Sequence, residues 1–474
     1  MSNARGKNSP DEARGATGAS LPPGAAPAAD KSAPAAAADE AGPAALADEA
    51  GAAAHPGRHR HLHATDLHGA GRLLLLAVVL GIDKVEHWHL HLLTRLGCGD
   101  AADRHGKQGR PGNMGKLGAF VYRQARGTAT LAGRWIDRLA PGAGGAGGRA
   151  GQPPPLSSAQ REAVLAALNG LFGDLLERLG NPLAIPMRLR HHGKPLLLER
   201  DALAAAFPGA GPRLVILIHG LCRSDLQWRR AGHDHGAALA RDLGYTPLYL
   251  HYNSGRHVSV NGRELAGLLG QLVAAWPVPV TTMAIIGHSM GGLVARSACH
   301  YARATRQPWL RRLRHLVFLG TPHHGAPLER HGNWLGAVLG RSAITAPFAR
   351  LGEMRSAGIT DLRYGNLLDE DWHGRGRFEH SGDLRRKLPL PRGVRCYTIA
   401  GTTGRRTGDL RDRLLGDGLI PLDTALGRHP DPGRSLAFPR SRQSIAFGVH
   451  HLDLVSRREV YDTIRHWLDE GGAS

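Results

Sequence analysis

The pentapeptide Gly287-His288-Ser289-Met290-Gly291 constrains the fold of this 474-residue chain more than any other feature. The apolar run before it, at 281–286, is typical of a buried strand, and residues 291–298 after it have the composition of a helix. A sharp strand-to-helix turn needs small residues on both sides, because a Cβ there would collide with the strand or the helix. We therefore predict that Ser289 lies at this bend, facing the N-terminal N–H groups of the helix, as a candidate nucleophile.

A serine hydroxyl is a poor nucleophile at neutral pH, so a histidine must take its proton and a carboxylate must orient that histidine. Asp417 follows the apolar run 394–400 and is flanked by glycines, which favours it as the acid. Asp453 is an alternative, although its position favours capping a helix or orienting a loop. His450 and His451 compete for the role of base, and we favour His451 because it opens the HLDL string before the last helix.

Stabilising a tetrahedral intermediate requires two N–H donors, one after the nucleophile and one after an early strand. The apolar run 214–218 is suited to a strand buried on both faces and is followed by His219-Gly220-Leu221. The sequence predicts the backbone N–H groups of Leu221 and Met290 as these donors, with Gly220 supplying conformational freedom. We expect His219 to pack the loop and not to act as a catalyst.

Five motifs occur in order between about residue 211 and the end of the chain: HGL, GHSMGG, LGTPHHG, GDGLIP and HLDL. Together they resemble the lipase and esterase branch of the α/β-hydrolases, and in particular bacterial proteins with a GPI inositol-deacylase-like hydrolase domain. The resemblance covers a little over half of the chain. It implies Ser289 as nucleophile, Asp417 as acid and His451 as base.

The resemblance also implies a substrate cleft bordered by the LGTPHHG segment. The candidate substrate-binding residues are His219, Gly220, His288, Thr321, Pro322 and His323. Some secreted lipases of similar pattern bind calcium through an aspartate two residues after the catalytic histidine, with a glutamine on the following turn. Asp453 matches the aspartate, but Arg457 stands where the glutamine would be, so we predict no metal and no other cofactor.

The predicted reaction is hydrolysis of carboxylic esters through an acyl-enzyme intermediate, and the resemblance implies lipid-like substrates. Two alternatives remain open at this level. One is an acyltransferase or thioesterase that uses the same three residues. The other is a non-catalytic interaction protein on a hydrolase scaffold.

Apolar runs alternate with helical segments through the second half of the chain; the runs are 214–218, 246–250, 283–287, 315–319 and 395–400. This alternation predicts an α/β-hydrolase fold with a mostly parallel sheet and helices on both faces. The insertion at about 327–392 interrupts the pattern where such enzymes place a cap or lid, and the alternative is a packing excursion without a gating role.

Composition divides the chain into three predicted parts. Residues 1–60 are rich in Ala, Pro and Gly and lack large apolar side chains, which predicts a disordered tail. Residues 61–205 form a helical accessory region with a Gly/Pro-rich loop near 141–157, and 206–474 form the hydrolase domain. The apolar run at 73–82 is about half the length needed to span a bilayer, so we interpret it as a packed helix.

The formal net charge is +20, but the arginines are dispersed and no nucleic-acid-binding motif accompanies them. We therefore expect no nucleic-acid partner, and contact with an anionic lipid surface is the better interpretation of the charge. No secretory signal pattern follows Met1, so we expect a cytoplasmic location, with a location peripheral to the membrane as the alternative. The four scattered cysteines indicate free thiols, and His87 and His91 are interpreted as polar helix positions and not as zinc ligands.

Overall fold

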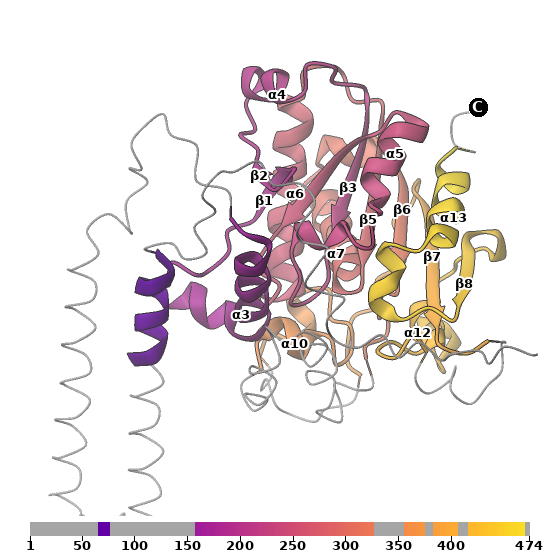
Figure 1. The fold of residues 1–474 in the computed structure, drawn as a ribbon. Coiled ribbons are helices and arrows are strands. Elements are labelled where there is room, and N and C mark those ends of the chain that lie inside the picture. The colour runs from indigo at the N-terminus through magenta and orange to yellow at the C-terminus, as the bar shows by residue number, and fades with distance from the viewer. Residues whose placement is uncertain (1–64, 76–156, 327–354, 375–382, 406–415, 470–474) are drawn as a thin grey trace, which may run out of the picture. The chain divides into compact units, whose positions relative to one another are not determined.

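The computed structural model describes residues 65–75, 157–326, 355–374, 383–405 and 416–469. Eight strands form one sheet in the order β2-β1-β4-β3-β5-β6-β7-β8 (Figure 1). The strands are β1 (Arg188–His191), β2 (Lys194–Pro195), β3 (Arg213–Ile218), β4 (Thr246–His251), β5 (Thr282–His288), β6 (Leu313–Leu319), β7 (Arg395–Thr402) and β8 (Gln443–Phe447). The neighbours from β4 to β8 pair in parallel, which confirms the predicted mostly parallel sheet.

All five predicted apolar runs are strands of this sheet, and each strand extends slightly beyond its run. The sequence did not reveal the hairpin of β1 and β2, which joins the sheet through antiparallel pairing of β1 with β4. Only Leu189 is buried in the four residues of β1, and β2 has two exposed residues. Such short edge strands lack the continuous apolar run that marks a strand buried on both faces.

Helices cover both faces of the sheet, because successive side chains along β3 point alternately into two different cores. Leu214, Ile216 and Ile218 belong to the core beneath α6 (Val258–Ala275) and α7 (Met290–Ala304). Val215 and Leu217 belong to the opposite core, beneath α5 (His235–Leu243) and α13 (Arg458–Asp469), which lie side by side in Figure 1. The remaining helices are α3 (Ala159–Arg178), α4 (Arg200–Ala206), α10 (Ala357–Asp361) and α12 (Leu422–Ala425).

The α3 helix has Ser158 as its N-cap, whose hydroxyl accepts a hydrogen bond from the Arg161 amide. A helical segment at 65–75 contacts it through a 2.6 Å ion pair between Arg161 and Asp66. None of the described helices is long and apolar enough to cross a membrane. The predicted tail at 1–60, His87, His91 and nearly all of the loop at 141–157 lie outside the described residues.

The predicted cap insertion is described at 355–374 and 383–392, and its other residues lie outside the described ranges. Its α10 helix is tied to the helical layer: the Ser356 hydroxyl donates to the Gly170 carbonyl of α3 at 2.6 Å. The Asp361 carboxylate accepts a hydrogen bond from the Val258 amide at the start of α6. This part of the insertion therefore packs against α3 and α6.

Candidate active site

Ser289 occupies the turn between β5 and α7 with φ of 54° and ψ of −125°. Positive φ is uncommon for a residue with a side chain and is typical of a strained functional turn. The Ser289 amide donates to the Leu319 carbonyl of the neighbouring strand β6 at 2.8 Å, and its carbonyl accepts from the Gly292 amide at 3.1 Å. These two bonds hold the serine backbone in the strained conformation.

Close packing on both sides of the serine explains the two glycines of the pentapeptide. A Cβ on Gly287 would lie 2.6 Å from the Gly292 backbone. A Cβ on Gly291 would lie 2.3 Å from the Ile218 carbonyl oxygen, at the end of β3. Both distances are shorter than any normal contact, so the turn requires glycine at these positions.

Asp417 and His451 form a buried pair at the same edge of the sheet. His451 Nδ1 lies 2.7 Å from Asp417 Oδ2, and the His451 amide donates to the Asp417 carbonyl at 3.0 Å. The other carboxylate oxygen accepts from the amides of Leu419 and Ile420 at 3.1 and 2.9 Å. Because these bonds fix the carboxylate, it orients the imidazole with Nδ1 as donor and leaves Nε2 free to accept a proton.

The His451 imidazole packs against the segments that hold Ser289. His288, next to the serine, bonds the His451 carbonyl through Nε2 at 3.0 Å, and the two ring centroids lie 4.7 Å apart. A Cβ on Gly320, which follows the Leu319 carbonyl that anchors the serine, would lie 3.0 Å from the His451 ring. Within the described residues the Ser289 hydroxyl makes no hydrogen bond, so a bond between this hydroxyl and the imidazole is not formed here.

The predicted donors for an oxyanion flank Ser289. A Cβ on Gly220 would lie 2.9 Å from the Ser289 Cβ, so the loop after β3 approaches the nucleophile as closely as glycine allows. Leu221 and Met290 are buried, and their amides donate to no other group in the described part of the chain. Two unused N–H donors next to a serine are what a tetrahedral oxyanion requires.

The alternative acid and base lie in different surroundings. Asp453 forms a 3.0 Å ion pair with Arg230 and is partly exposed. His450 is exposed and precedes the 3-10 turn at His451–Val455. Of the two histidines and two aspartates considered, the structure brings together His451 and Asp417.

His219 and His288 are buried beside the site and line a small cavity of about 120 Å³ together with Trp228. Burial lowers the pKa of His219 to about 3, and burial also holds the pKa of His288 well below its usual value. Both rings are therefore neutral at pH 7. The His219 ring stacks on Tyr252 with centroids 4.4 Å apart, and the Tyr252 hydroxyl donates to the His219 carbonyl. His219 thus packs the loop, in the position that the sequence suggested.

The other predicted cleft residues extend away from the serine. Thr321 is buried against α7, where a Cβ on Gly292 would lie 2.0 Å from its hydroxyl oxygen. Pro322 is also buried, and His323 lines a second, larger cavity of about 460 Å³. The loop that follows β6 therefore runs from the catalytic edge of the sheet to a separate cavity.

One group of side chains has the spacing of metal ligands: Glu162, Asp225 and His251, all buried. Arg190 lies between the two carboxylates, with its Nη1 2.9 Å from Glu162 and 3.1 Å from Asp225. Since this guanidinium already supplies a positive charge to both, the group fits an ion-pair network better than a divalent metal.

Sequence reasoning missed several residues that shape the site. Tyr252 supports His219, and the Ser254 hydroxyl accepts from the Cys222 amide, just after the predicted oxyanion donor. Cys222 itself has a positive φ of 57°, so the loop after β3 is strained as well. None of these residues belongs to a recognisable motif, and only the fold brings them to the loop. Cys222, Cys299 and Cys396 are free, as predicted, and all three are buried; Cys98 lies outside the described residues.

Residues 211–375 match the family model described as PGAP1-like alpha/beta domain. A search among curated proteins returned no match to this chain. Among solved structures, the chain is similar to a Bacillus licheniformis lipase in its propeptide form, with 18% identity and a TM-score of 0.35 over 54% of this chain and 50% of that one. The chain thus spans about half of the length of that lipase.

Two archaeal proteins are also similar to the chain. A hyperthermophilic esterase from Pyrobaculum calidifontis has 14% identity and a TM-score of 0.34, covering 65% of this chain and 91% of that one. The esterase Pf2001 from Pyrococcus furiosus has 14% identity and a TM-score of 0.33, covering 55% and 82%. These likenesses are too distant to support an argument about substrates. The sheet order, the strained turn at Ser289 and the family match carry the assignment. The described residues therefore have an α/β-hydrolase fold, and residues 211–375 match the PGAP1-like alpha/beta domain family.

Proposed function

We propose that this protein is a carboxylic ester hydrolase that acts through Ser289, His451 and Asp417. One observation carries the proposal. A fixed 2.7 Å carboxylate–imidazole pair packs against the turn that holds a serine at positive φ, beside two unused backbone amides. A structural pair would need none of these neighbours, whereas acyl transfer needs all of them.

In the proposed reaction the Ser289 hydroxyl gives its proton to His451 Nε2 while Oγ attacks the ester carbonyl carbon. The carbonyl oxygen becomes an oxyanion that accepts hydrogen bonds from the Leu221 and Met290 amides. As the intermediate collapses, the C–O bond to the alcohol breaks and the imidazolium protonates the leaving oxygen. Water then attacks the acyl-enzyme with His451 as base, releasing the acid and restoring the serine.

Lipid-like esters are the substrates we propose, in line with the motifs that the chain shares with lipases and esterases. The formal net charge of +20 supports work at an anionic lipid surface, because such a surface attracts basic proteins. The reaction needs no cofactor, since the serine, the imidazole and the carboxylate supply the nucleophile and the proton transfers.

Hydrolysis of p-nitrophenyl esters of graded chain length tests the proposal. We expect turnover by the wild-type protein, with a chain-length preference, and loss of turnover in Ser289→Ala. A suitable control is Ser456→Ala, since Ser456 follows the same turn as His451 and its hydroxyl contacts only the Asp453 carbonyl. Equal turnover by wild type and Ser289→Ala would overturn the proposed nucleophile.

A further inference from the structure

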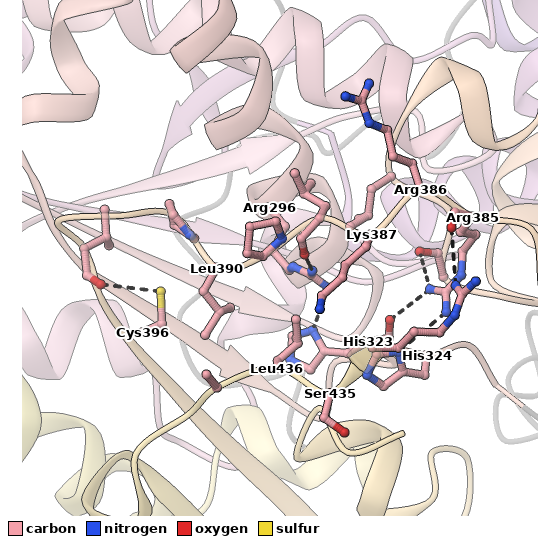
Figure 2. Close-up of a pocket in the computed structure, with 18 of the residues that line it drawn as sticks. Arg296, His323, His324, Arg385, Arg386, Lys387, Leu390, Cys396, Ser435 and Leu436 are labelled. Atoms are coloured by element: carbon pink, nitrogen blue, oxygen red, sulfur yellow. Dashed lines mark hydrogen bonds between the residues drawn. The ribbon is translucent and has the colours of Figure 1, made fainter. Parts of the chain in front are cut away.

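The larger cavity, of about 460 Å³, lies beside α7 and is separate from the serine. Figure 2 shows residues from several parts of the chain around it, among them Arg296 of α7, His323 and His324 after β6, the segment from Arg385 onward, and Ser435 and Leu436. Its volume lies in the range of small-molecule sites. The cavity is therefore large enough for an organic ligand.

Positive charge dominates the cavity wall. Its cationic residues are Arg296, Arg385, Arg386, Lys387, Arg434 and Arg442. Asp371 supplies the one carboxylate among the residues that line it. That carboxylate is already engaged, because it accepts hydrogen bonds from the amides of Leu367, Leu368 and Arg386 at 2.9 to 3.0 Å.

Arg385 and Arg434 share a carboxylate partner that does not line the cavity, and the exposed Arg386 lies 3.7 Å from Glu370. Arg385 pairs with Asp383 at 2.8 Å, and Arg434 lies 3.4 Å from the same carboxylate. Arg385 also donates hydrogen bonds to the carbonyls of His323 and Gly365, so its side chain links two loops. Neither of these two arginines needs a ligand to satisfy its charge.

Arg296 differs from them because no carboxylate pairs with it in the described part of the chain. Its side chain is buried, and it donates to the Leu388 carbonyl at 2.6 Å and contacts His323 Nδ1 at 3.3 Å, while its Nε has no partner. Burial and the nearby Arg385 lower the pKa of Arg296 to about 10, which leaves it charged at neutral pH. The His323 ring is neutral, since burial holds its pKa well below the usual value, and its Nε2 has no partner.

A buried charge without a counter-ion is costly, and an anion in the cavity would supply what Arg296 lacks. The cavity lining also includes apolar residues, namely Leu388, Pro389, Leu390, Val394 and Leu436. We propose that this cavity binds an organic phosphate, with the phosphate facing Arg296 and Lys387 and the apolar part facing Leu390 and Leu436. Several cations around one point favour a phosphate dianion over a carboxylate. Arg386 points away from the other labelled cations in Figure 2 and lies outside the proposed phosphate contact.

Isothermal titration calorimetry of the full chain with phenyl phosphate tests this proposal independently of any esterase activity. We expect saturable binding that weakens as salt rises, weaker binding of inorganic phosphate, and none of phenol. Lys387→Met should weaken phenyl phosphate binding about tenfold by removing one charge contact. Both Lys387 and Lys194 are exposed, so Lys194→Met is a matched control with the same charge change outside the cavity.

Arg296→Met should abolish binding while the variant still melts cooperatively without ligand, because the substitution removes a charge that has no partner. Competition with vesicles containing phosphatidic acid distinguishes two sources of the phosphate. Displacement of phenyl phosphate by the vesicles assigns the site to a lipid headgroup, and no displacement assigns it to a free phosphate ester. No binding of phenyl phosphate, or equal affinity in Lys387→Met and Lys194→Met, would overturn the proposal.

Discussion

Two buried carboxylate–imidazole pairs occur in the described part of the chain, and they differ in their surroundings. Asp417 and His451 lie 2.7 Å apart at the carboxyl edge of the sheet, next to the turn that holds Ser289. Glu162 and His251 lie 3.2 Å apart where α3 meets β4. The chemical groups are nearly the same, yet we assign catalysis to the first pair alone.

A neighbouring arginine already compensates the charge of the second pair. Arg190 contacts both Glu162 and Asp225, so this network joins α3, β1, β4 and the loop after β3. The first pair has no ion-pair partner besides itself among the described residues, and its imidazole packs against the serine turn. We infer from this comparison that an open ring nitrogen beside a nucleophile suits the first pair to catalysis, whereas the neighbouring guanidinium makes the second pair structural.

Neutralising each carboxylate in turn should distinguish the roles of the two pairs. Asp417→Asn should give the largest effect, which is on kcat. Because an asparagine leaves the imidazole in the wrong tautomer, we expect kcat for an activated ester to fall about 10⁴-fold with the fold retained. Steady-state kinetics and circular dichroism measure the two quantities. Asp453→Asn is the matched control: it breaks only the partly exposed pair with Arg230 and should leave kcat near the wild-type value. Equal losses in both variants would contradict the choice of acid.

Glu162→Gln should have the converse effect. We expect the free energy of unfolding to fall by about 3 kcal/mol, because Arg190 and His251 lose the charge that compensates them in the interior, while kcat is retained. Urea denaturation measures the change. Glu177→Gln on the same helix removes the half-exposed partner of Arg256 and should cost less than about 1 kcal/mol.

The acid dependence of stability sharpens this prediction. Burial alone would raise the pKa of Glu162, but His251 and Arg190 outweigh it and hold that pKa well below its usual value. A folded-state pKa below the unfolded one gives stability that is present above about pH 4.3 and is lost as the pH falls further. Asp225, whose pKa burial raises, acts in the opposite sense. The stability difference between wild type and Glu162→Gln should therefore shrink below pH 4.3, and a constant difference would rule out this linkage.

Gly220→Ala should give a smaller catalytic loss than Asp417→Asn. The added Cβ would lie 2.9 Å from the Ser289 Cβ and displace the loop that carries the Leu221 amide. Loss of one oxyanion donor predicts a fall in kcat of about 10²-fold with little change in KM. The control is Gly267→Ala on α6, where a Cβ meets no atom within 4 Å, and its activity should match the wild type.

The sequence predicted the parts of the molecule that depend on local pattern. The five apolar runs became strands, because residues such as Ile216 and Ile285 are buried on both faces of a parallel sheet. The glycines around Ser289 predicted the turn, because their spacing reflects contacts with the strand and helix beside them.

The sequence patterns did not predict contacts between segments that are far apart in the chain. Glu162 and His251 are 89 residues apart, and nothing in α3 marks Glu162 as buried among apolar neighbours. Arg296 likewise lies in a helix whose composition does not show that its guanidinium is buried. The role of such a buried charge depends on the fold, because the fold determines whether a partner of opposite charge lies near it.

Labelling with a fluorophosphonate probe tests the central claim most directly, because the probe reacts with an activated serine whatever the natural ester is. We predict that the wild-type protein is labelled and that peptide mass spectrometry places the adduct on Ser289. Ser289→Ala should show no labelling, and Asp417→Asn should react far more slowly. Undiminished labelling of Ser289→Ala, or an adduct on another serine, would contradict the account.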